Sequence, residues 1–165
     1  MPRRILIVEA DPHVAREMFG LFHFDSERYE QERYEPEIAG SVAEAIEMAR
    51  NVKFDCIIMD AVLPDMDVCD AIPLMKTINN APPIIITTVN NDLHLEANVR
   101  MQDVYYYHVR IPGTNELELA VRSIFEKLQK VRRTEEGKKR VFERVLLKQM
   151  GTFVREVSEG KASEG

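Results

Sequence analysis

The sequence lacks several features that would point to other classes of protein. It has no tryptophan, two cysteines and seven glycines in 165 residues. Cys56 and Cys69 form neither a disulfide framework nor a C-x-x-C pair. No apolar run approaches the roughly 18 residues that a membrane-spanning helix needs, and the N-terminus lacks the apolar segment of a signal peptide. We therefore expect a cytoplasmic protein without disulfides and without a membrane partner.

A glycine-rich phosphate loop is also absent. Flavin and nucleotide binders place glycine or Ser/Thr after a strand, but here the apolar run 5–8 is followed by Glu9-Ala10-Asp11-Pro12. Without a metal ion these acids would repel a phosphate. The four histidines show no metal-ligand spacing. These absences disfavour an enzyme or a cofactor binder.

Charge of one sign does not dominate the sequence, but it is unevenly distributed. The net charge of −6 argues against a general nucleic-acid binder. Residues 1–125 carry 11 Lys and Arg against 21 Asp and Glu, whereas residues 126–165 carry 11 against 7. An acidic body with a basic C-terminal segment follows. That segment is too short for a helix-turn-helix domain with its own core, so we expect no nucleic-acid partner.

Strand-like apolar runs alternate with helix-like segments through the first 133 residues. Such alternation is typical of βαβ units and predicts an α/β fold with a parallel sheet. Helices are expected to begin near Pro12, Ser41, Asp70, Asn90 and Asn115, and Ser41 is predicted to form a capping box with the glutamate three residues later. The predicted strands are residues 4–9, 34–39, 54–60, 84–88 and 104–109.

The chain is expected to comprise a body (residues 1–133), a helical extension (134–158) and a disordered tail (159–165). The last helix of the body, 115–133, carries apolar residues at a regular helical spacing. Thr134-Glu-Glu-Gly137-Lys-Lys interrupts this stripe, and a second amphipathic helix is predicted from about Lys138 to Val157. Because an apolar stripe has to be buried, the extension should dock on the body or form a dimer.

Two of the apolar runs end in acids. Ile5-Leu6-Ile7-Val8 ends in Glu9, and Phe54-Asp55-Cys56-Ile57-Ile58-Met59 ends in Asp60, four residues ahead of Pro64. The carboxyl ends of parallel strands meet at one edge of a sheet, where open α/β folds place their sites. We therefore expect Glu9 and Asp60 to share one crevice.

These residues resemble the receiver domain of response regulators, the phosphoacceptor module of bacterial two-component signalling. The resemblance covers about residues 3–131. It implies a flavodoxin-like, doubly wound sheet of five parallel strands in the order 2-1-3-4-5. The family's site has two acids after the first strand and a phosphoacceptor aspartate after the third. A hydroxyl follows the fourth strand, and a lysine follows the fifth.

Several positions match this pattern. Asp60 matches the phosphoacceptor, and Leu63-Pro64 match the loop after it. Glu9 matches the first acid of the site. Thr88 matches the hydroxyl residue and, with Tyr107 at the aromatic position, the switch pair of the family.

Other positions depart from the pattern. Ala10 stands where the second acid is expected, and Arg110 stands where the lysine is expected. Val89 replaces a small residue, Ile111 a proline and Val68 a glycine. Arg110 keeps the positive charge, but its planar fork does not reproduce an ammonium point charge.

The resemblance also implies a Mg²⁺ ion. Its ligands would be Glu9, Asp60 and the backbone carbonyl of Val62, with Asp11 as a further candidate. Ala10 removes a carboxylate that would coordinate the ion directly. The longer side chain of Glu9 offers one compensation and Asp11 another, and otherwise the ion binds weakly.

We therefore expect a non-enzymatic signalling receiver domain that acts through protein–protein contacts, with phosphotransfer to Asp60 weakened by Ala10 and Arg110. The alternative is a phosphorylation-independent pseudo-receiver that acts as an interaction or assembly module. The expected partners are a sensor histidine kinase or phosphotransfer protein and a downstream protein. A second copy is a further candidate, bound through the face of the fourth and fifth strands and their helices or through the C-terminal helix.

Overall fold

The computed structural model describes residues 2–28, 33–78 and 81–162. The chain divides into two compact units, Met1–Ile124 and Phe125–Gly165, which we describe separately. The strands of the first unit are β1 (Arg3–Val8), β2 (Tyr34–Ala39), β3 (Cys56–Asp60), β4 (Ile84–Thr88) and β5 (Tyr106–Val109). The helices are α1 (Pro12–Arg28), α2 (Val42–Asn51), α3 (Val68–Thr77), α4 (Leu93–Arg100) and α5 (Glu116–Ala162), which runs on into the second unit.

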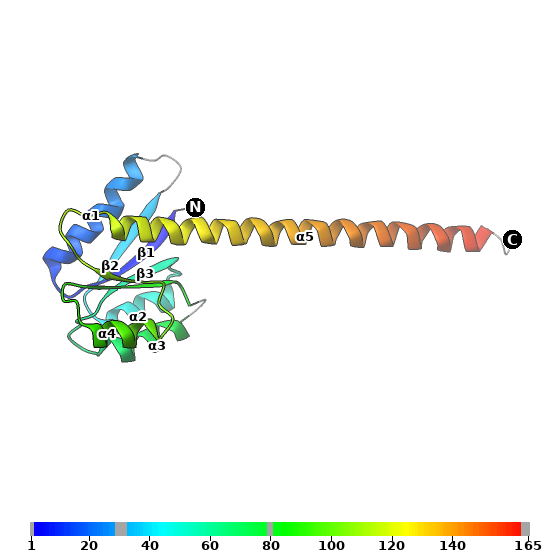
Figure 1. Cartoon of the computed structure of the whole chain (residues 1–165). Coiled ribbons are helices and arrows are strands. Elements are labelled where there is room, and N and C mark those ends of the chain that lie inside the picture. Colours follow the sequence, from blue (N-terminus) through cyan, green and yellow to red (C-terminus); the bar gives the residue numbers. More distant parts are fainter. Residues whose placement is uncertain (1, 29–32, 79–80, 163–165) are drawn as a thin grey trace. The chain divides into compact units, whose positions relative to one another are not determined.

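The five strands form one parallel sheet in the order β2-β1-β3-β4-β5, so the predicted doubly wound α/β fold is confirmed. Helices α2, α3 and α4 lie on one face of the sheet, and α1 lies on the other (Figure 1). Every residue of β3 and β4 is buried. Apart from the polar residues at their carboxyl ends, these central strands are continuous apolar runs, as expected for strands that helices cover on both faces.

Local sequence signals position two of the helices. The Ser41 hydroxyl accepts a hydrogen bond from the Glu44 amide at 3.2 Å, and the Glu44 carboxylate accepts one from the Gly40 amide at 2.7 Å. The predicted cap at Ser41 is therefore confirmed. Helix α3 starts earlier than predicted, because Asp67 rather than Asp70 caps it. Pro73 is tolerated inside the helix, whose apolar side is fully buried.

Helix α5 is the largest difference from the sequence-based prediction. It runs without a break from Glu116 to Ala162, so the predicted interruption at residues 134–139 is wrong. That stretch consists mainly of Glu and Lys, which are strong helix formers, and a single glycine costs only about 1 kcal/mol. Residues 159–162 of the predicted disordered tail belong to α5, and residues 163–165 lie outside the described part. Among the described residues, no helix is long and apolar enough to cross a membrane.

The buried central strands predict where the fold is most sensitive to truncation. Ile57 in β3 is completely buried, so Ile57→Ala should lower the free energy of unfolding by about 2–5 kcal/mol through lost burial and a residual cavity. Leu119 on α5 is 51% exposed, and Leu119→Ala should change it by less than about 0.5 kcal/mol. Urea unfolding of the three proteins measures both effects. Equal losses would contradict this assignment of the core.

Candidate functional site

The carboxyl ends of four neighbouring strands carry the residues that the sequence singled out. Glu9 follows β1, Asp60 ends β3, Thr88 ends β4 and Arg110 follows β5. Backbone hydrogen bonds fix the ends of these strands relative to one another. Ala61 donates to the Thr87 carbonyl at 2.8 Å, and Arg110 donates to the Thr88 carbonyl at 2.7 Å. The site is thus built on the rigid edge of the sheet.

The Arg110 guanidinium connects the two acids. Its Nη1 lies 3.2 Å from Glu9 Oε2 and its Nη2 lies 3.6 Å from Asp60 Oδ2. Both acids are buried, with Glu9 4% and Asp60 8% exposed. The structure therefore brings Glu9, Asp60 and Arg110 together in one crevice, with the cation spanning both carboxylates.

Internal partners occupy both oxygens of the Glu9 carboxylate. Oε1 accepts a hydrogen bond from the Asp11 amide at 2.9 Å, and Oε2 accepts one from Arg110. Burial raises the pKa of Glu9, and the neighbouring Asp60 acts in the same direction. The Asp11 amide and the charge of Arg110 act in the opposite direction and favour the ionised form. The carboxylate is therefore held by contacts within the protein.

Asp11 is not part of the crevice. Its carboxylate caps α1, where Oδ1 accepts hydrogen bonds from the His13 amide at 2.8 Å and the Val14 amide at 3.4 Å. These bonds lower the pKa of the exposed Asp11 side chain. Val62 lies in the loop after β3, two residues past Asp60, and its side chain is 70% exposed.

The residues present do not fit a Mg²⁺ ion well. Among the described residues, no group of three or more His, Cys, Asp or Glu side chains could hold a metal. Ala10 supplies no ligand, Asp11 is engaged as a cap, and the guanidinium of Arg110 contacts both remaining carboxylates. Mg²⁺ requires octahedral oxygen coordination and commonly uses one or two carboxylates with several waters. Here both carboxylates already have a cation as their partner.

The two switch positions are both buried. The Thr88 side chain is 2% exposed, and its hydroxyl exchanges hydrogen bonds with the Asn90 backbone at 3.1 and 3.2 Å. Tyr107 is 4% exposed and its ring lies 5.9 Å from the Arg100 guanidinium carbon. Within the described part of the chain its hydroxyl has no hydrogen-bond partner, and burial raises its pKa. The Tyr107 ring thus points into the protein.

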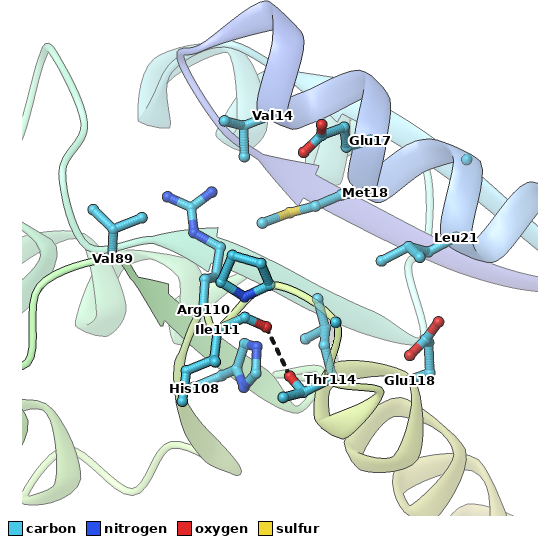
Figure 2. Close-up of a pocket in the computed structure, with 14 residues that line it drawn as sticks. Val14, Glu17, Met18, Leu21, Val89, His108, Arg110, Ile111, Thr114 and Glu118 are labelled. Carbon is cyan, nitrogen blue, oxygen red and sulfur yellow. Dashed lines mark hydrogen bonds between the residues drawn. The ribbon is translucent and has the colours of Figure 1, made fainter.

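An open groove of about 1140 Å³ adjoins the crevice. Helix α1 forms one wall, and the segment from β5 to the start of α5 forms the other (Figure 2). Arg110 reaches up between Val89 and Val14 at one end of the groove. Val89, where the receiver pattern has a small residue, is 62% exposed beside this cation.

Asp65, an acid in the loop after β3, has a role that was not predicted. Asp65 accepts hydrogen bonds from the Val42 amide at 3.0 Å and the Ala43 amide at 2.9 Å, and these bonds lower its pKa. It thereby ties the loop after Asp60 to the N-terminus of α2. Its partners are 22 and 23 residues away, so no local sequence signal identifies this contact.

The chain belongs to the response regulator receiver domain family, whose pattern matches residues 5–122. Comparison with curated proteins found no match.

Similar solved structures share the fold at low sequence identity. A CheY-like receiver domain protein from Methanospirillum hungatei JF-1 is 23% identical, with a TM-score of 0.64 over 79% of this chain and 96% of that one. Response regulator TrrA from Thermotoga maritima, solved in complex with Mg²⁺–BeF, is 20% identical, with a TM-score of 0.59 over 74% and 98%. A fusion that contains the yeast Spc42 trimeric coiled coil is 19% identical, with a TM-score of 0.67 over 94% and 95%.

A buried histidine beneath the groove predicts a pH effect on stability. His108 is 4% exposed, and burial lowers its pKa below the ordinary 6.5, partly opposed by Glu116, whose carboxylate lies 3.7 Å from Nδ1. The unfolded chain therefore binds a proton more readily than the folded one as the pH falls below 6.5. Wild type should lose stability between pH 7 and 5, and His108→Leu should lose less, by about 1.4 kcal/mol for each unit of pKa lowering.

Urea unfolding at pH 7, 6 and 5 measures this difference. His94→Leu is the matched control because His94 is exposed on α4. Its pH dependence should equal that of the wild type. A parallel loss of stability in wild type and His108→Leu would show that His108 does not contribute.

Proposed function

We propose that this receiver domain is a signalling module in which Asp60 stands at the phosphoacceptor position but phosphotransfer is weak. It acts through protein–protein contacts and not as an enzyme on a separate substrate. The observation that carries the proposal is the Arg110 guanidinium, which contacts both Glu9 and Asp60. A nucleophilic carboxylate paired with an arginine is less available to attack a donor phosphate.

The electrostatics of phosphoryl transfer support a weak reaction. The transfer depends on cations that neutralise the charge of the phosphoryl group and of the attacking carboxylate. TrrA, which shares the fold, has been solved with Mg²⁺–BeF. In this chain Ala10 removes one carboxylate, and Arg110 already neutralises part of the charge of the other two. The attraction for a divalent ion is therefore reduced.

Family membership suggests the partners. A sensor histidine kinase or phosphotransfer protein would supply the phosphoryl group, and a downstream protein would receive the signal in the cytoplasm. The face formed by α4, β5 and the start of α5 is a suitable surface for the downstream protein. It exposes large apolar side chains, with Leu93 75% and Met101 85% exposed. A phosphorylation-independent module would use the same surface.

Acetyl phosphate tests whether Asp60 in the crevice can accept a phosphoryl group. Incubation of the wild type with acetyl phosphate and Mg²⁺ should leave its intact mass largely unchanged. The double variant Ala10→Asp/Arg110→Lys restores the second acid and the lysine of the receiver pattern. It should gain the mass of one phosphoryl group to at least about tenfold greater extent, a difference of about 1.4 kcal/mol in barrier. Mass spectrometry of the intact proteins measures both.

Asp60→Asn in the double-variant background is the control for the site of modification and should remain unmodified. Equal phosphorylation of the wild type and the double variant would contradict the proposed weakening. If the double variant also stays unmodified while its unfolding curve matches the wild type, the phosphorylation-independent alternative is favoured.

A further inference from the structure

Helix α5 carries an apolar stripe that repeats every 11 residues. Along residues 128–150, the positions that face one side of the helix follow the spacing 3-4-4. We call these positions the seam. The seam consists of Leu128, Val131, Glu135, Lys139, Phe142, Leu146 and Met150. Five of these seven positions are apolar, and the two exceptions are a glutamate and a lysine four residues apart.

The described seam residues are not buried within their own unit. Val131 is 53%, Phe142 68%, Leu146 45% and Met150 56% exposed. The repeat also has counterparts upstream, because Leu117 and Ile124 continue the same spacing. These two are 6% and 1% exposed in the first unit. A helix with one exposed apolar face gains most of its stability by packing that face against a partner.

We propose that the seam forms a parallel coiled coil with a second copy of this chain. A sustained 11-residue repeat corresponds to about 3.67 residues per turn and keeps the apolar face on one side of a nearly straight or right-handed pair of helices. Five basic side chains fall on the opposite side of the helix at about 100° per residue, namely Lys130, Arg133, Arg140, Arg144 and Lys148. This arrangement turns like charges toward solvent and apolar side chains toward the partner.

The two charged seam positions favour another copy over a lipid surface. Glu135 and Lys139 occupy adjacent layers of the seam, so in a parallel pair the two glutamates of one layer lie beside the two lysines of the next layer and the four charges balance. On a bilayer surface the same two charged side chains, paired only with each other, would lie in the middle of the apolar face against the acyl chains. A polar layer of this kind specifies register in a coiled coil at a cost in stability.

The parallel direction follows from which seam positions are exposed and can contact a second copy. An antiparallel pair with Glu135 opposite Lys139 would be centred on Gly137, and it would place Met150 opposite Ile124 of the other copy. Ile124 is already buried in the first unit. In a parallel pair every seam residue from Leu128 onward meets its own equivalent. The inference does not depend on the phosphotransfer activity of Asp60.

Light scattering on the full chain tests the proposal. The wild type should have the mass of two copies, and Phe142→Glu should reduce it to one copy, because it removes an apolar layer of the seam and adds two negative charges that the two lysines at position 139 do not balance. Leu147→Glu is the matched control, because Leu147 is also 68% exposed but lies off the seam, and it should retain the mass of two copies. Circular dichroism at the same concentration checks that the body remains folded in both variants.

Cysteine cross-linking tests the direction and register. In a Cys69→Ser background, Leu146→Cys should form a disulfide with its own equivalent on oxidation, and Leu147→Cys should form much less. Cross-linking of Leu128→Cys to Leu146→Cys in a mixture, without self-linking of Leu146→Cys, would overturn the parallel arrangement. A single-copy mass for the wild type at all concentrations would overturn the proposal. Sedimentation of that monomer with anionic lipid vesicles would then assign the seam to a lipid surface.

Discussion

The contact of one guanidinium with two buried carboxylates determines the charge balance of the crevice in this receiver domain. Glu9 and Asp60 are brought to the same sheet edge by β1 and β3, and their charges would repel each other there if no cation were present. Arg110 reaches both from the end of β5. Removal of one partner from a buried ion pair costs about 3–5 kcal/mol, because it leaves an uncompensated charge. The crevice is therefore held together by the protein's own cation.

Two departures from the receiver pattern become consistent once they are considered together. Loss of the second acid at Ala10 lowers the negative charge of the crevice, and a guanidinium at position 110 can span two carboxylates where an ammonium offers a single charged centre. Two carboxylates and one guanidinium leave about one negative charge. An arrangement of this kind has less need of a divalent ion than one with three acids. Ala10 and Arg110 thus have matching effects on the crevice, because the first removes a negative charge and the second neutralises part of the charge that remains.

Local patterns predicted the sheet, the Ser41 cap and the proximity of Glu9 to Asp60. Each of these depends on residues that are neighbours in the sequence, such as an apolar run and the acid that ends it. The contacts that sequence reasoning missed join distant segments. Asp65 caps a helix that starts 23 residues earlier, and Arg110 pairs with Glu9 across 101 residues. The continuity of α5 was missed for another reason. Glu135 and Lys139 interrupt an apolar stripe without interrupting a helix, because both residues have high helix propensity.

The crevice and α5 are linked by a short stretch of chain. Residues 110–115 join the end of β5 to Glu116, where α5 begins, and the Arg110 amide is fixed to the Thr88 carbonyl. The guanidinium that holds Glu9 and Asp60 is therefore six residues from the helix that carries the seam. A change in the partners of Arg110 has to be absorbed either within these six residues or by the first turns of α5. Since Leu117 and Val121 are buried in the body, those turns cannot shift without disturbing the core. The ion pairs of Arg110 thus favour one fixed arrangement of the connection between β5 and the first turns of α5.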